Sequence, residues 1–388
     1  MKSAPVQNSS SVATVYPDTS GLRSSSRSLF NNAVAVYPQL GEGPHSYSSR
    51  SLTIILVTCF FFSSFYGQVN TASKGSSAQP GDTTTKEEIV EMLKNLPHPG
   101  FLDSQTKPNK NLRLLIGGLN VVGYGTSIVI FNNQWYKNYP KTSFHTFNDS
   151  KEWLQMDKIG HSWAAYNSGR ASTAMWKWAG LSDKKATWIG GLSSTAYLTV
   201  IEILDAHSAK WGWSWADMGA NIFGSGLFIS QELGWQEQRI QFKFSFHRKK
   251  YSDPMLNARS DELFGSTWAE RMLKDYNGQS YWLSANLKSF FPNSNLPAWL
   301  NVAVGYGADG MFGGFENKWT DGDPGFPIDR TDIKRFRQWY LAPDIDFTKI
   351  NTNKKVVKVL LDFLNAFKFP APSLELSNGQ LKVNAIHF

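Results

Sequence analysis

Hydrophobic positions along the chain change their period near residue 238. Before this point, three long runs are mostly apolar and rich in small residues: 112–131, 186–204 and 215–235. Each run has the length of a helix that could cross or line a membrane, although Gly, Ser and Asn dilute its hydrophobicity. Together with the segment 157–180, these runs predict a unit of four helices over residues 112–238. Small residues in the third run are expected to let helix backbones approach closely, namely Gly219, Ala220, Gly224 and Gly226.

After residue 238, apolar and polar residues alternate with a period of two, which predicts β-strands. The alternation begins at residues 240–247, which read IQFKFSFH. It returns along the chain at residues 281–291, 298–307, 335–347 and 381–388. In the second of these segments it places Leu287 and Lys288 in the strand. The turn PNSNLP at residues 292–297 predicts a hairpin between the second and third segments.

The two patterns together predict an α+β fold. A small-residue-rich helical bundle at 112–238 is expected to precede an antiparallel β region at 239–388, which includes a C-terminal helix and a final strand. Apolar residues outside and polar residues inside are typical of a membrane-embedded sheet or a partial barrel. A soluble antiparallel sheet with one wet face produces the same alternation. Residues 305–332, which are rich in Gly and in acidic groups, are expected to form a long loop between strands.

The first 111 residues are mostly polar, apart from one short apolar run. Residues 1–49 are expected to be disordered or to lie upstream of the true start of the protein. Arg50, followed by the apolar run 52–62, predicts a secretory signal peptide over residues 50–67. Residues 68–111 are expected to be a polar linker with a short helix. The signal peptide predicts that the chain is exported to the cell envelope.

Composition narrows the choice of partners. Aromatic residues make up 14% of the chain, which favours a location at a membrane interface. The net charge is +8, but the basic residues are scattered, so no nucleic-acid partner is expected. A membrane or an outer-membrane protein is the expected partner, and the oligomeric state is left open. The single cysteine, Cys59, excludes an intramolecular disulfide and a cysteine-rich zinc site, and the apolar residues after it argue against lipid attachment.

Charged residues occur at helical spacing within the predicted helices. Asp157 and His161 are four residues apart and share a helix face, and Asp217 and Asn221 repeat this spacing. A charge on the apolar part of a helix is costly unless it is paired, so these side chains are expected to converge. The predicted polar cluster consists of Asp157, Lys158, His161, Glu202, Asp217 and Asn221.

Two functions are compatible with such a cluster. In the first, the chain is a non-enzymatic envelope protein with a structural or partner-binding role. The outer membrane is its favoured location, and the inner membrane and the periplasm are the alternatives. In the second, it is an enzyme acting on an envelope lipid or glycan, whose catalytic candidates are His161, Asp157, Glu202 and Asp217. A metal ion would be held by some of His161, Glu202, Asp205 and Asp217. No cofactor is clearly implied, because the sequence lacks the HExxH, G-x-S-x-G and P-loop motifs.

The order of these motifs also resembles a known family. DKIGH at 157–161, then Glu202, then WSWADMGANIFGSGLF at 213–228 resemble the VanZ-like pattern of a DK-x-x-H helix, a helix bearing Glu and a D-x-x-x-N-x-x-G helix. The same region, 153–234, is similar to the YfiM-related family of predicted periplasmic lipoproteins of unknown function. The resemblance implies that the family's polar positions fall on the cluster residues and on Gly224. It implies no established reaction.

Overall fold

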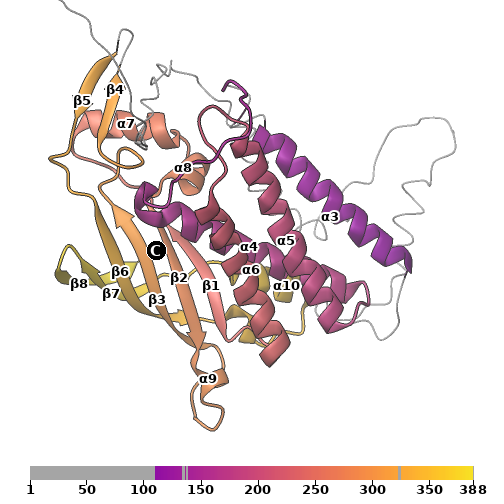
Figure 1. Cartoon of the computed structure of the whole chain (residues 1–388). Helices are drawn as coiled ribbons and strands as arrows, with labels where there is room; N and C mark the ends of the chain where they lie inside the picture. Colours follow the sequence, from indigo (N-terminus) through magenta and orange to yellow (C-terminus); the bar gives the residue numbers. More distant parts are fainter. Residues whose placement is uncertain (1–109, 133–135, 137–138, 322–324, 388) are drawn as a thin grey trace, which may run out of the picture. The chain divides into compact units, whose positions relative to one another are not determined.

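The computed structural model describes residues 110–132, 136, 139–321 and 325–387 (Figure 1). The expected extension at 1–49, the signal peptide at 50–67 and nearly all of the linker at 68–111 lie outside the described residues. The described helices and strands belong to one compact unit.

Four long helices make up the first part of the described chain: α3 (Lys110–Phe131), α4 (Met156–Trp178), α5 (Asp183–Ala206) and α6 (Trp215–Trp235). They correspond to the three apolar runs and to the segment 157–180, from which four helices were predicted. A short 3-10 helix, η2 (Glu152–Gln155), leads into α4. Helix α4 packs against both α5 and α6, whereas α3 contacts mainly α4. By length and composition, residues Lys110–Val129 of α3 are able to cross a membrane, and only 17% of this stretch is buried.

Two glycines set the spacing of α5 and α6 from α4. A Cβ atom on Gly190 would lie 2.1 Å from Oγ1 of Thr173, and one on Gly224 would lie 2.0 Å from the carbonyl oxygen of Ser162. Both distances are far below van der Waals contact, so only glycine fits. Gly219 and Gly226, which were expected to serve the same purpose, have nothing within 4 Å of the Cβ position. That expectation was wrong for these two, because they lie on the exposed side of α6.

The second part of the chain contains an antiparallel six-stranded sheet with the order β1-β2-β3-β6-β7-β8. The strands are β1 (Ile240–Phe246), β2 (Gln279–Asn286), β3 (Leu300–Asp309), β6 (Phe336–Ile345), β7 (Ala371–Ser377) and β8 (Gln380–His387). The predicted hairpin at residues 292–297 joins β2 and β3. The α+β class with an antiparallel sheet is therefore confirmed. Among the described residues, the sheet is open and not a closed barrel.

Several elements differ from the period-two prediction. Leu287 and Lys288 lie in a short helix, α9 (Leu287–Phe290), because the Asn286 side chain accepts a hydrogen bond from the backbone N–H of Ser289 and starts a helical turn. The expected long loop at 305–332 instead contains the end of β3 and a separate hairpin, β4 (Lys318–Asp321) and β5 (Phe326–Asp329).

Three further helices interrupt the β region. Helices α7 (Pro254–Phe264) and α8 (Trp268–Lys274) lie between β1 and β2, where no helix or strand was predicted. The predicted C-terminal helix is α10 (Lys355–Leu364), which follows a 3-10 turn, η3 (Phe347–Lys349). Strand β7 was also missed, although the strand after it was predicted.

The two faces of the sheet have different surroundings. Near β1, the apolar face packs on the helices, where Phe242, Phe244 and Tyr281 join Tyr166 of α4 and Phe228 of α6 in one hydrophobic core. Figure 1 shows α4 and α6 beside β1, with β6, β7 and β8 on the far side of the sheet. The other face of the sheet carries buried polar side chains beside a small apolar cluster around Trp282. The helices therefore cover only the β1 side of the sheet.

The buried polar face contains its own ion pairs. Nζ of Lys243 in β1 lies 2.9 Å from Asp344 in β6, and Nζ of Lys368 lies 3.7 Å from the same carboxylate. Oγ of Ser284 donates to Asp344 at 2.6 Å. A short parallel bridge between Phe244 and Phe367 brings the segment before β7 to the free edge of β1. These contacts tie the two sides of the sheet together through its interior.

Candidate functional site

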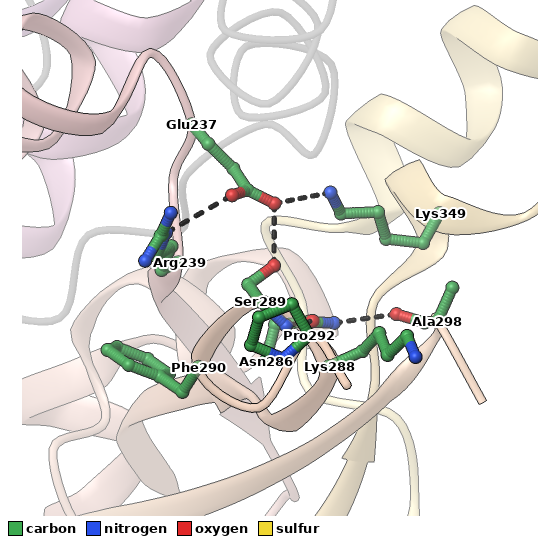
Figure 2. A pocket seen from close by; sticks show the side chains of 9 residues that line it. All are labelled: Glu237, Arg239, Asn286, Lys288, Ser289, Phe290, Pro292, Ala298 and Lys349. Carbon is green, nitrogen blue, oxygen red and sulfur yellow. Dashed lines mark hydrogen bonds and ion pairs between the residues drawn. The ribbon is translucent and has the colours of Figure 1, made fainter. Parts of the chain in front are cut away.

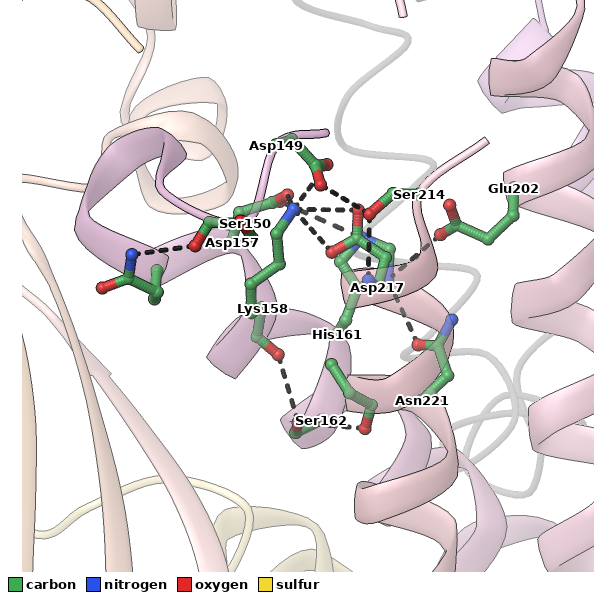
Figure 3. A network of polar contacts seen from close by, with 12 residues as sticks. Asp149, Ser150, Asp157, Lys158, His161, Ser162, Glu202, Ser214, Asp217 and Asn221 are labelled. Carbon is green, nitrogen blue, oxygen red and sulfur yellow. Dashed lines mark hydrogen bonds and ion pairs between the residues drawn. The ribbon is translucent and has the colours of Figure 1, made fainter. Parts of the chain in front are cut away.

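The predicted polar residues meet at one end of the helices, where α4 and α6 begin and α5 ends (Figure 3). They are Asp157, Lys158 and His161 from α4, Glu202 from α5, and Asp217 and Asn221 from α6. Each spacing of three or four residues puts its pair on one helix face, and the close packing of α4 against α5 and α6 brings the three faces together. The cluster is mostly shielded from solvent, because side chains of the bundle surround it.

Lys158 is the central cation of the cluster. Its Nζ lies 2.6 Å from Asp149, 3.0 Å from Asp157 and 2.8 Å from Asp217. Burial by itself lowers the pKa of Lys158, but the Asp157 and Asp217 carboxylates outweigh burial and raise that pKa above its usual value. The charged amine therefore joins three segments of the chain: the loop before η2, the start of α4 and the start of α6.

His161 lies between two pairs of polar groups. Its Nδ1 is 3.1 Å from Oδ1 of Asn221 and 3.6 Å from Oε1 of Glu202. Its Nε2 is 3.9 Å from a carboxylate oxygen of both Asp157 and Asp217. Burial by itself lowers the pKa of His161, but the three nearby carboxylates outweigh burial and raise it to about 9. The imidazole is thus charged at neutral pH in the absence of a metal ion.

The carboxylates of the cluster respond differently to their surroundings. Burial raises the pKa of Glu202 to about 8 and that of Asp217 to about 6, against the lowering effect of His161. Burial also raises the pKa of Asp157, but the charges of His161 and Lys158 outweigh it, so that this pKa is lowered. Asp157 therefore stays ionised, whereas Glu202 holds a proton at neutral pH.

Three further residues complete the cluster and were not predicted. Oγ of Ser214 donates to Asp149 at 2.6 Å and accepts from the backbone N–H of Asp217 at 3.0 Å, which caps α6. The hydroxyl of Tyr276 donates to Asp157 at 2.8 Å. The Ser-x-x-Asp capping spacing is a signal for Ser214. Asp149 and Tyr276 have no such signal, since they come from a loop and from beyond α8.

Asp205, a metal-binding candidate, lies apart from these contacts. Its carboxylate accepts a hydrogen bond from the hydroxyl of Tyr136 at 2.8 Å. Burial raises the pKa of Asp205 to about 7, against the lowering effects of the Tyr136 hydrogen bond and of the His161 charge. The group of described residues that could hold a metal ion consists of Asp157, His161 and Asp217, whose ligand atoms lie within 4.8 Å of one another. Asp205 and Glu202 are outside this group.

The donor set partly fits a divalent cation. Nδ1 of His161 faces Asn221, an arrangement that commonly orients the other nitrogen toward a metal ion. Imidazole and carboxylate ligands suit zinc and similar metals. However, the Lys158 amine already bonds Asp157 and Asp217, so that a metal ion would share its ligands with a positive charge. His161, Asp157 and Asp217 are thus suitable ligand types for a metal ion, but the charge of Lys158 opposes metal binding.

A second candidate region is a surface pocket between the start of β1 and α9 (Figure 2). Its lining includes Glu237, Arg239, Ser289 and Lys349. Glu237 is bonded by Ser289 at 2.6 Å, by Arg239 at 3.2 Å and by Lys349. Its basic residues are Arg239, Lys288 and Lys349 and its one acidic residue is Glu237, so the pocket is positively charged. No residue of the polar cluster lines it.

Residues 146–230 match a family described as a predicted periplasmic lipoprotein (DUF2279). The matched region contains α4, α5 and most of α6, and so it includes Asp149, Ser214 and all six predicted cluster residues. It is less than half of the chain and does not include Cys59. No curated protein and no solved structure is detectably similar to the chain.

The match bears on two of the predictions. It supports the similarity to an uncharacterised family of periplasmic lipoproteins, and in coarse form it supports a location in the periplasm or envelope. The VanZ-like and YfiM-related names and the outer membrane in particular stay predictions, as do the roles of the individual site residues.

Proposed function

We propose that the chain is an exported envelope protein associated with the outer membrane, with a non-enzymatic structural or partner-binding role. The family match over residues 146–230 supports the envelope location. In this proposal the polar cluster holds α4, α5 and α6 together and performs no reaction. The observation that carries this proposal is the position of Lys158, whose amine is bonded by three carboxylates.

The charges of the cluster support a structural role in a second way. A general base needs an unprotonated nitrogen near neutral pH, whereas the pKa of His161 is raised to about 9. His161 is instead a cation among carboxylates, and with Lys158 it offsets the negative charge of Asp149, Asp157 and Asp217. Removal of His161 leaves Lys158 as the one cation that pairs with these carboxylates among the described residues, which lowers the stability of the folded chain.

Membrane fractionation of the full chain tests this proposal. We expect wild type in the outer-membrane fraction. We expect His161→Ala to have lower abundance and a free energy of unfolding reduced by about 1–3 kcal/mol, since Asp157 and Asp217 then share Lys158 as their cation. His207→Ala is the control, because His207 is exposed at the end of α5.

Two outcomes would count against the proposal. Recovery of wild type in the inner-membrane or soluble fraction contradicts the outer-membrane location. A His161→Ala variant as stable and as abundant as the His207→Ala control contradicts the structural role of the cluster.

A metal-assisted enzyme acting on an envelope lipid or glycan is the second candidate. It is favoured by the position of His161 Nε2 at equal distances from Asp157 and Asp217, too far for hydrogen bonds. The test is the metal content of purified chain after treatment with a chelator and then Zn²⁺ or Mn²⁺. Stoichiometric metal that is lost in His161→Gln and retained in Asp205→Asn would favour this candidate. Wild type that retains no metal would remove its basis.

A further inference from the structure

One face of the six-stranded sheet carries an exposed apolar row. Leu283, Val304, Leu341, Leu374 and Val383 are neighbours in register on β2, β3, β6, β7 and β8. They are 41–75% exposed, although all five are large aliphatic residues. A second row beside it consists of Trp339, Leu376 and Leu381, which are 49–70% exposed. We call these eight residues the outer band.

The opposite face of β2, β3, β6 and β7 is buried, and it carries polar residues beside a small apolar cluster of Trp282, Ala303, Tyr340 and Ala342. Ser284, Asn301 and Asp344 are at most 2% exposed, and Glu375 is 7% exposed. These groups bond one another: Ser284 donates to Asp344 at 2.6 Å, and Asn301 donates to Ser284 at 2.9 Å. A soluble sheet with one wet face has the reverse arrangement, with its polar side toward water. Apolar-out and polar-in strands are typical of a sheet that faces lipid.

Charged residues lie at both ends of the band, and exposed aromatic residues lie at one of them. At the end where β3 begins, Phe291 and Trp299 are 61% and 43% exposed. The charged pocket that contains Arg239 and Lys349 lies at this end too (Figure 2). At the other end, β6 begins directly after Lys334 and Arg335. Exposed aromatic residues beside charges are typical of the boundary between lipid and water.

The two longest strands of the sheet are long enough to reach across a lipid layer. Strands β3 and β6 each contain ten residues, and a strand of about 9–11 residues reaches across the hydrocarbon core of a bilayer. The exposed apolar positions take up two rows of these strands, because Tyr306, the next residue after Val304 on this face of β3, is buried in the core with the helices.

From these observations we infer that the outer band lies against the acyl chains of a lipid bilayer. The sheet is then the lipid-contacting surface of the protein, and its buried polar face keeps the ion pairs of Lys243 and Lys368 away from lipid. This inference rests on the proposed envelope function and adds the surface and the class of molecule that it contacts.

Site-specific labelling of the full chain tests the inference. In a Cys59→Ser background, Leu341→Cys and Val304→Cys each place one thiol in the outer band for an environment-sensitive fluorophore. Thr320→Cys is the matched control, because Thr320 is exposed on β4, away from the band. The labelled proteins are reconstituted in phosphatidylethanolamine–phosphatidylglycerol vesicles, with or without nitroxide groups on the acyl chains. Soluble iodide serves as the quencher in water.

We expect labels at positions 341 and 304 to lose most of their fluorescence to the acyl-chain nitroxide and to be protected from iodide. The label at position 320 should show the reverse. Quenching of the band labels by iodide would overturn the inference. Protection from both quenchers would overturn it in favour of a second copy or another protein on this face.

Failure of this inference can be told apart from failure of the proposed function. If wild type fractionates with the outer membrane while the band labels stay accessible to iodide, the protein is an envelope protein that uses a different surface. If the band labels meet lipid but wild type is absent from the outer-membrane fraction, the lipid-contacting surface stands and the proposed location falls.

Discussion

The chain buries charge in two places, and the two networks differ in how many partners each cation has. In the helices, Lys158 is bonded by three carboxylates, and the side chains of Asp157 and His161 remain 25% and 19% exposed. In the sheet, Lys243 and Lys368 share Asp344, and their side chains are 0–1% exposed. The helical network is therefore redundant and reachable by solvent, whereas the sheet network depends on one carboxylate and is closed.

This difference shows what each network is able to do. A redundant network tolerates the loss of a carboxylate and can exchange protons with water, so it can change with pH. A closed network with one shared carboxylate neither tolerates the loss of that carboxylate nor exchanges protons with water. A buried charge that loses its partner there cannot be solvated. We therefore expect variants of the two networks to differ in stability and in pH dependence.

The largest effect is expected from Asp344→Ala. It leaves the amines of Lys243 and Lys368 buried with backbone carbonyls as acceptors, and we expect it to reduce the free energy of unfolding by about 3–5 kcal/mol. Asp157→Ala should cost about 1 kcal/mol, since Lys158 keeps Asp149 and Asp217. Denaturant titration of both variants measures the difference. Equal losses would contradict the contrast between the networks.

A smaller effect is expected from the glycines that let the helical cluster form. A methyl group at Gly224 would collide with the carbonyl of Ser162, so Gly224→Ala should cost about 1–3 kcal/mol. Gly219→Ala on the same helix meets nothing within 4 Å and should be neutral or stabilise by up to about 1 kcal/mol. Thermal unfolding of the two variants provides the comparison. Similar destabilisation by both would show that the α4–α6 contact is not close.

The smallest effect is the pH dependence of the helical network. The pKa of His161 is raised from 6.5 to about 9, so the folded chain binds this proton more tightly than the unfolded chain. Its contribution to stability is fully present below pH 6.5 and is lost as the pH rises through about 9. We expect His161→Gln to reduce the fall in the free energy of unfolding between these values. The measurement is made with a chelator present, and an unchanged pH profile would contradict a charged His161.

The helical cluster is the part of the site that the sequence predicted best. Asp157 and His161, like Asp217 and Asn221, are spaced by one helical turn, and a helix fixes the relative direction of such side chains without help from the rest of the fold. The convergence of the three helices followed from the cost of leaving their charges unpaired. Asp149 and Tyr276 escaped prediction because a loop and a distant segment bring them to Asp157 and Lys158, and no local spacing records that contact.

The sheet was predicted less completely. Alternation identified β1, β2, β3, β6 and β8. It extended β2 through Leu287 and Lys288, where the Asn286 side chain starts a helical turn instead. It also gave no account of β7, α7 or α8. A period of two separates the two faces of a strand but does not state which face is covered.

The sequence by itself determined the elements whose period is strong and the residues that share a helix face, because both depend on the local geometry of the backbone. Only the tertiary structure decided which polar groups meet and which face of the sheet is buried. Those outcomes depend on contacts between residues far apart in the chain, such as Lys158 with Asp217 and Lys243 with Asp344. The exposure of Leu341 also depends on the tertiary structure, because the helices cover the β1 side of the sheet and leave Leu341 uncovered.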